Sequence, residues 1–157
     1  ESSFKMLSKL LIRKGMISIY VYRKKGPLRE FADNHIREST IQMTEKQCME
    51  FSKSMALLGK NISQLKKKIT ITEDIPLLKI KAGTYDVQRF LYWNFLKCWW
   101  SPDVPFDQSV ATNYDWYFPK FAYRHSEKEV RKWFKDVKLK IVHFNEIESG
   151  FSVNGEK

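Results

Sequence analysis

Glycine is scarce in this sequence, and its few glycines are widely spaced. The 157 residues include six glycines, and no two of them are closer than five positions apart. A loop that cradles a phosphate or a dinucleotide needs closely spaced glycines, because its backbone must turn sharply and approach the ligand. The sequence contains no G-x-G-x-G string and no P-loop. It therefore carries no glycine-rich cofactor loop.

Cysteine is also scarce, and long apolar runs are absent. Cys48 and Cys98 are the two cysteines, and two such distant thiols predict neither a disulfide framework nor a zinc site. We expect both to be buried structural residues in a reducing compartment such as the cytoplasm. No window approaches the roughly 20 apolar residues of a membrane span. The catalytic patterns H-E-x-x-H and Ser-His-Asp are not found, and no metal site is expected.

Positive charge is in excess. The formal net charge is +10 and the isoelectric point is near 9.6, with basic groups at 23–25 and 66–68. Such an excess raises the question of nucleic acid or an anionic surface as partner. Neither basic group alternates with aromatic residues, and no recognition-helix string is visible. A solvated basic surface is therefore favoured, and a cationic interface with an acidic partner or a missing domain is the main alternative.

Each end of the chain combines a helix with one or two strands. Apolar spacing predicts a helix over 4–14 that ends at Gly15, followed by a strand over 16–22 with alternating apolar residues. Near the other end, Ser126 and Glu129 form an S-x-x-E capping box that begins a helix. Two strands follow it and predict a hairpin, with bounds 140–146 and 151–153.

The residues between these ends predict mainly helices. One begins at Gly26-Pro27 and should bury a face with Leu28, Phe31, His35 and Ile36. Thr44 and Gln47 predict a second capping box, on a helix that stops at Gly59. The remaining expectations are a short strand or extended crossing at 69–72, a buried helix over 86–100 and an irregular aromatic segment over 103–124.

Both ends resemble class I S-adenosylmethionine-dependent methyltransferases. The run Arg124-His125-Ser126, with Val130, Trp133 and Phe134 on the next helix, is similar to that family's C-terminal H-[ST]-x-E-E-V-x-x-W-F helix. Residues 150–157 resemble its closing hairpin, which ends near V-x-G-[RK]-[RK]. Residues 4–22 look like its fourth crossover helix and fifth strand, and 25–124 look like the lid that many members insert. The departures are Lys138, where the family often has glycine, and Asn154 and Glu156, where it often has basic residues.

The resemblance implies an incomplete Rossmann-like fold of class α/β. It predicts a half-sheet of about three strands in the family order 5-7-6, with strand seven antiparallel between the other two, and a large, mainly helical insertion. The implied divisions are 1–24 (helix and strand five), 25–124 (helical lid) and 125–157 (final helix and hairpin). The strand-five edge would be unpaired, and it could pair with a missing N-terminal cofactor domain or with a second copy of the chain.

In this family the cofactor S-adenosylmethionine is held by a glycine-rich loop after strand one and an acidic residue after strand two. Neither is found here. We therefore expect the chain to be the C-terminal half of a longer enzyme. Alone it should bind no cofactor and be inactive, and the acceptor would be a small molecule of unknown identity. The rival interpretations are a non-enzymatic interaction module that pairs with another chain and, with less support, a basic nucleic-acid-binding domain.

The substrate in this fold lies beyond the carboxyl ends of the strands and beneath the lid. Catalytic residues cannot be assigned from the sequence. Each substrate-binding candidate has a plainer alternative: a solvated loop after the strand, a packed turn in the lid, or a local role beside the cap at Ser126. The candidates are Tyr22, Arg23, Asn113, Tyr114, Asp115, Trp116, Tyr123, Arg124 and His125.

Overall fold

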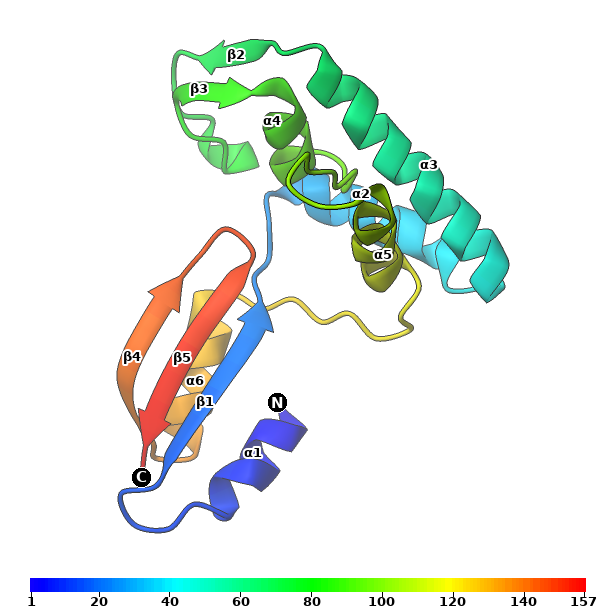
Figure 1. Cartoon of the computed structure of the whole chain (residues 1–157). Coiled ribbons are helices and arrows are strands. Elements are labelled where there is room, and N and C mark those ends of the chain that lie inside the picture. Colours follow the sequence, from blue (N-terminus) through cyan, green and yellow to red (C-terminus); the bar gives the residue numbers. More distant parts are fainter. The chain divides into compact units, whose positions relative to one another are not determined.

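The structure, a computed structural model, describes all residues from 1 to 157 and is a mixed α/β fold with two small antiparallel sheets. The chain divides into two compact units (Figure 1). Unit 1 comprises residues 1–24 and 123–157, and unit 2 comprises residues 25–122. None of the helices combines the length and the apolar character needed to cross a membrane.

Unit 1 contains a three-stranded sheet built from both ends of the chain (Figure 1). Its strands are β1 (Met16–Tyr22), β4 (Lys140–Glu146) and β5 (Gly150–Glu156). Their order is β1-β5-β4, and β5 is antiparallel to both neighbours. The prediction of three strands here, with the last one antiparallel in the middle, is confirmed.

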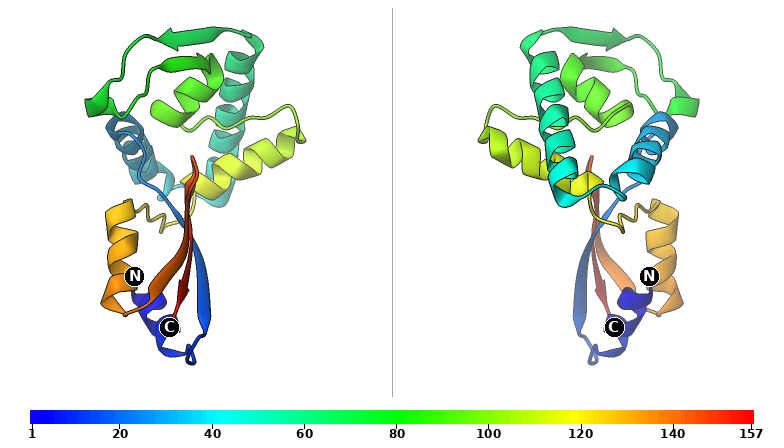
Figure 2. Two further views of the ribbon diagram at one scale, coloured as in Figure 1. Left: turned by 90° about the vertical axis from the view of Figure 1, so that its left-hand side faces the viewer. Right: turned by 90° about the vertical axis from the view of Figure 1, so that its right-hand side faces the viewer.

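Two helices of unit 1 pack against one face of this sheet: α1 (Ser2–Lys9) and α6 (Glu127–Asp136). Figure 2 shows the sheet nearly edge-on with α6 to one side. Val130, Phe134 and Val153 are fully buried between the layers, and the Phe4 ring lies 4.7 Å from that of Phe134. A Cβ at Gly155 would lie 2.4 Å from the Phe134 ring, so only glycine permits this close approach.

Unit 2 is mainly helical. Its core surrounds Cys48, Cys98 and Tyr117, all fully buried, and both thiols are free, as predicted. Helices α3 and α5 pack against each other, and β2 pairs with β3 in the second sheet. The elements are α2 (Pro27–Thr40), α3 (Glu45–Gln64), β2 (Lys68–Ile71), the 3-10 turn η1 (Pro76–Leu78), β3 (Gly83–Asp86), α4 (Val87–Asn94) and α5 (Phe106–Tyr117).

Both predicted capping boxes are present, at Thr44 and at Ser126, but several predicted helix ends are wrong. Helix α1 ends at Lys9 rather than at residue 14. Helix α3 continues past Gly59, where a Cβ would lie 2.3 Å from the Cys98 carbonyl oxygen. That glycine therefore permits close packing and does not end the helix.

Other expectations for unit 2 are also corrected. The helix predicted over 86–100 ends at Asn94, and buried side chains then form hydrogen bonds with the backbone of residues 97–99. The segment 103–124, expected to be irregular, contains α5. The sheet of β2 and β3 raises the number of strands above the predicted three.

The predicted buried face of α2 is wrong in part: Ile36 packs half-buried against the core of unit 2, but the other predicted side chains are exposed. Phe31 is 72% exposed, and its ring stacks on that of His35, whose side chain is 75% exposed. The polar side chains face inward, because buried backbone carbonyls and a carboxylate accept their hydrogen bonds. These inward residues are Arg29, Asp33, Arg37 and Thr40.

Candidate functional site

Five of the nine predicted site residues come together at the carboxyl end of β1 in unit 1. Arg23 and His125 form a parallel β-bridge. The His125 N–H donates to the Tyr22 carbonyl at 2.8 Å, and the Lys24 N–H donates to the His125 carbonyl at 2.9 Å. Residues 123–125 therefore run beside residues 22–24, and two distant segments build one surface.

His125 is the titratable group of this surface. Its ring lies edge-on to Trp133 with centroids 4.5 Å apart, and the Tyr123 ring stacks against it at 6.5 Å. Burial lowers the pKa of His125, and the opposing charge of Glu129 offsets only part of that effect. The imidazole is therefore largely neutral at pH 7 and can accept a proton.

Aromatic and charged side chains flank this imidazole. Tyr22 is 41% exposed and Tyr123 is 69% exposed, so both rings can contact a ligand. Arg23 forms an ion pair with Glu146. The surface therefore combines two exposed aromatic rings with a largely neutral imidazole.

The other four predicted residues lie on α5 in unit 2, and they divide by role. Asn113 is fully buried and acts as a clamp: its amide oxygen accepts from the Trp99 N–H, and its NH₂ donates to the Trp99 carbonyl, each at 2.9 Å. The Tyr114 ring stacks on Phe118 at 4.8 Å. Asp115 is exposed and Trp116 is buried. Asn113 therefore has a structural role in holding the backbone at Trp99. Trp116 lies against a set of buried charged side chains that was not predicted from the sequence.

That group is a set of buried charges around Trp116. The Arg29 Nε donates to both carboxylate oxygens of Asp33, at 2.9 and 3.0 Å, and its guanidinium also donates to the Tyr92 carbonyl. The guanidinium carbon lies 5.1 Å from the centroid of the Tyr92 ring and 5.8 Å from that of Trp116. Arginine and aspartate four residues apart on a helix were the available sequence signal.

Lys97 is the second cation of this group. Its side chain is buried, and its ammonium nitrogen lies 4.6 Å from the Trp116 ring centroid and 5.8 Å from that of Tyr92. Burial lowers the pKa of Lys97 to about 8, and the charge of Arg29 acts in the same direction. A single lysine inside the apolar run 86–100 was the signal that could have located it.

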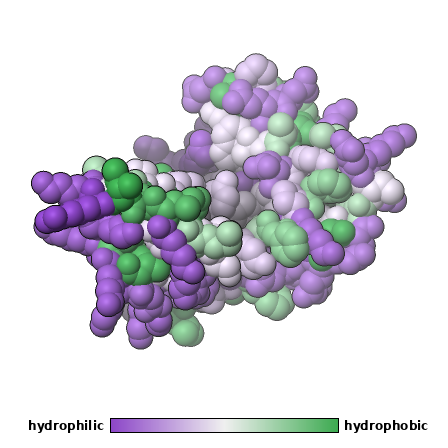
Figure 3. Space-filling model, turned by 90° about the horizontal axis from the view of Figure 1, so that it is seen from below, coloured by the Kyte–Doolittle hydropathy of each residue, from purple (hydrophilic) through white to green (hydrophobic).

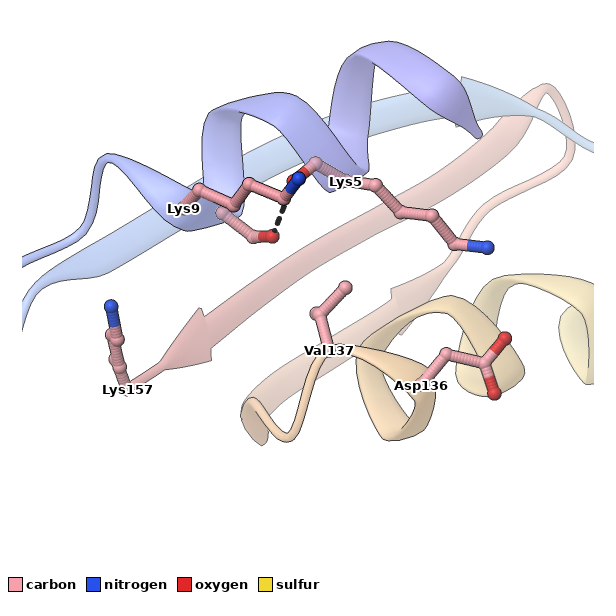
Figure 4. A pocket seen from close by; sticks show the side chains of 6 residues that line it. Lys5, Lys9, Asp136, Val137 and Lys157 are labelled. Atoms are coloured by element: carbon pink, nitrogen blue, oxygen red, sulfur yellow. Dashed lines mark hydrogen bonds between the residues drawn. The ribbon is translucent and has the colours of Figure 1, made fainter.

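A basic hollow in unit 1 is a weaker site. It has a volume of about 640 Å³ and is lined by Lys5, Ser8, Lys9, Asp136, Val137 and Lys157 (Figure 4). Lys5 pairs with Glu1, and Lys157 donates to the Leu11 carbonyl. Most of its charges are thus already engaged, and no group of three or more His, Cys, Asp or Glu side chains gathers anywhere to hold a metal ion.

Comparison with known proteins found no match among protein-family models, curated proteins or solved structures.

Proposed function

We propose that this chain is the substrate-side part of an S-adenosylmethionine-dependent methyltransferase that acts on a small-molecule acceptor. The observation that carries the proposal is the position of β5, antiparallel between β1 and β4. This is the order 5-7-6 of the family that the sequence resembles. The capped helix α6, which buries Trp133 and Phe134 against that sheet, adds support.

The main departure from the family pattern is compatible with this proposal. Lys138 occupies a position where the family often has glycine, and its φ is 58°. This is the left-handed region, which glycine enters without a steric penalty and other residues enter at a cost of about 1 kcal/mol. The backbone turn that favours glycine is therefore retained, although the side chain differs.

The chemistry of methyl transfer suits the surface at the end of β1. The methyl donor is a sulfonium that is already activated, so the protein mainly has to hold the acceptor in line, sometimes with help from a base. In the proposal Tyr22 and Tyr123 contact the acceptor, and the neutral imidazole of His125 takes its proton. This chain has no glycine-rich loop whose backbone N–H groups could bind the methyl donor. In the proposal, another polypeptide segment supplies the binding site for the donor.

Unit 1 has surface that such a segment would cover. Apart from the bridge between Arg23 and His125 just beyond its C-terminal end, the outer edge of β1 pairs with no strand, and Figure 3 shows hydrophobic residues gathered at the surface among hydrophilic ones. Edge strands and large apolar patches are places where further protein commonly packs. Exposed hydrophobic side chains of α1, of the turn after it and of β1 include Met6 at 69%, Leu10 at 78%, Ile12 at 79% and Met16 at 58%.

Calorimetry with S-adenosylmethionine tests the proposal. The 157-residue chain should show no binding, and the product of the complete reading frame, or the chain with its partner, should bind and transfer the methyl group. In that assembly His125→Gln should reduce the transfer rate by about 10²-fold or more, as expected for loss of a base, with little change in cofactor affinity. Micromolar binding to the chain alone, or an assembly that lacks any cofactor binding, would overturn the proposal.

A non-enzymatic interaction module is the second candidate, and the unpaired edge of β1 favours it equally. The two candidates differ in what co-purifies with the chain. A partner with a glycine-rich cofactor domain supports the enzyme, and a partner without one supports the module. Nucleic acid as a partner predicts affinity that falls steeply with rising salt, so absence of binding at low salt eliminates it.

A further inference from the structure

A hollow on the surface of unit 2 joins one of the two basic groups of the sequence to an aromatic residue. It has a volume of about 410 Å³, and its lining includes Trp100 and the basic run 66–68, which consists of Lys66, Lys67 and Lys68. No aromatic residue alternates with this run in the sequence. Trp100 is distant in the chain, so the fold creates a combination of cations and aromatic ring that the sequence does not reveal.

The backbone of the basic run is held in place. Lys66 has a φ of 50°, in the left-handed region, and the chain turns there from α3 into β2 (Figure 1). The Lys67 carbonyl accepts from the Val87 N–H at 3.0 Å, and Lys68 lies opposite Asp86 in the ladder of β2 and β3. The run is therefore ordered before any ligand arrives, which reduces the entropy lost on binding.

The positive charges of this run are not neutralised within the chain. All three lysines are exposed, and none of them forms an ion pair or a side-chain hydrogen bond with another residue. Asp86 also lines the hollow. Its carboxylate accepts from the Arg89 N–H at 3.1 Å and caps α4, where the N-terminal N–H groups of the helix offset part of its charge. Three ammonium groups therefore face one engaged carboxylate.

Trp100 is fixed beside these cations. It is half-buried, and its Cβ lies 3.2 Å from the position that a Cβ at Gly59 on α3 would take. The preceding residue, Trp99, is held by two hydrogen bonds from Asn113, each at 2.9 Å. The Trp100 ring forms no aromatic stack and no cation–π contact with another residue. It therefore offers aromatic surface that the chain itself does not use.

We propose that this hollow binds single-stranded nucleic acid, with one base stacked on Trp100 and the neighbouring phosphates beside the basic run 66–68. Aromatic stacking next to a cationic track is the usual way in which proteins bind single strands, and it tolerates any base. A duplex keeps the faces of its bases covered. Three successive cations match a chain of phosphates better than the phosphate of one free nucleotide, and the net charge of +10 also favours a polyanion.

This inference goes beyond the proposed function, because it requires neither a methyl donor nor a methyl acceptor. The probe is a fluorescently labelled oligothymidylate of about 12 nucleotides, and its anisotropy is followed with the 157-residue chain. We expect saturable binding at low salt. Trp100→Leu should weaken this binding at least about fivefold, because the stacking of a base is lost. Trp100→Phe keeps an aromatic face and should bind more tightly than Trp100→Leu.

The contribution of the lysines is measured by salt dependence. Joint replacement of the basic run 66–68 by glutamine should reduce the slope of log affinity against log salt by about 2, because each phosphate contact on a single strand contributes about 0.7. The matched control removes the same charge from exposed positions of unit 1, as Lys128→Gln, Lys135→Gln and Lys140→Gln together. This control should change the slope much less, and an equal change would overturn the assignment to the hollow.

Competitors identify the ligand class. Unlabelled oligothymidylate should displace the probe, whereas thymidine monophosphate, a duplex of the same length and polyglutamate should compete far more weakly. Equal competition by the monophosphate would overturn the single strand as the ligand. Equal competition by the duplex or by polyglutamate would overturn base stacking, and the latter would indicate an acidic protein partner.

A further measurement decides the question even if the Trp100 variants fail to fold. In the unaltered chain, an oligothymidylate that carries iodouracil is photo-crosslinked and the attachment site is mapped by mass spectrometry. We expect attachment at Trp100. Absence of binding at low salt, equal binding by folded Trp100→Leu, or attachment only outside the hollow would each overturn the proposal. None of these outcomes involves S-adenosylmethionine, so the methyltransferase proposal keeps its own test.

Discussion

Arg29 and Asp33 form an ion pair one turn apart on α2, with side chains that are 1% and 0% exposed. Removing one partner of a buried pair leaves an uncompensated charge, which costs about 3–5 kcal/mol. Asp33→Asn keeps the shape and removes the charge. We expect it to lower the free energy of unfolding by about 3 kcal/mol, as measured by urea denaturation.

An exposed pair with the same spacing serves as the control. Lys132 and Asp136 lie one turn apart on α6, 2.5 Å between nitrogen and oxygen, and their side chains are 67% and 30% exposed. Asp136→Asn should cost less than about 1 kcal/mol, because solvent screens such pairs. Equal losses in the two variants would show that Asp33 is not buried as described.

The acid sensitivity of unit 1 should depend on Glu129. Hydrogen bonds from the Ser126 side chain and backbone, and then from Lys24, lower the pKa of Glu129 from 4.5 to about 2. A folded-state pKa below the unfolded value gives stability that is complete above pH 4.5 and is lost as the pH falls toward about 2. Glu129→Gln should therefore flatten the fall in unfolding free energy over this range.

The matched control for this effect is Glu127→Gln on the same turn of α6. Glu127 pairs with Arg131 at 2.6 Å on the exposed surface, and it takes no part in the capping box at Ser126. Its replacement should cost less than about 1 kcal/mol of unfolding free energy, because solvent screens such pairs. Because the Glu129 side chain is 45% exposed, we expect a modest change in slope. Identical slopes for Glu129→Gln and the unaltered chain would contradict the assignment.

The secondary structure that the sequence predicted correctly was marked by local chemistry. The capping boxes at Thr44 and Ser126 each combine a hydroxyl with a Glu or Gln three residues later, and both were located to the residue. Alternating apolar residues located β1. These signals depend on neighbours in the chain, so they can be read without knowledge of the tertiary fold.

The errors arose where tertiary contacts override local preference. The polar face of α2 is buried because Arg29 finds a carboxylate and a distant backbone carbonyl, which no helical pattern reveals. The apolar run after Asn94 leaves the helix because distant side chains hold its backbone. For the same reason the cluster around Lys97 was missed, whereas the segments at 22–23 and 123–125 were chosen from their place beside strand and helix ends.

His125 should titrate below its ordinary value. Burial against Trp133 lowers its pKa from 6.5, so the unfolded chain binds more protons than the folded chain just below pH 6.5. The free energy of unfolding therefore does not depend on His125 well above that pH, and it decreases as the pH falls below it. The C2 proton of His125, followed by NMR, should give a midpoint below 6.5, and His125→Gln should remove that part of the pH dependence. A midpoint at or above the ordinary value would exclude the neutral base proposed for the site.

The unpaired edge of β1 should cause self-association of the isolated chain. The Lys157 N–H donates to the Gly15 carbonyl and the Arg23 N–H donates to the Ser149 carbonyl. In an antiparallel pair the bonding alternates, so the backbone N–H and C=O groups of odd-numbered residues in β1 point toward β5 and those of even-numbered residues point toward the outer edge. Strands with free N–H and carbonyl groups readily pair with another chain. We expect a mass by light scattering that rises from monomer to dimer with concentration.

Ser18→Pro tests this edge directly. Position 18 faces outward and is solvent-exposed, and proline is tolerated on an edge strand while removing the N–H that a partner strand needs. The variant should remain monomeric over the same concentration range, with its unfolding free energy compared by urea denaturation to show that the sheet persists. As a control, Ser18→Thr keeps the N–H and should associate like the unaltered chain. A monomer mass that is independent of concentration in the unaltered chain would eliminate self-pairing and leave the edge to a different polypeptide.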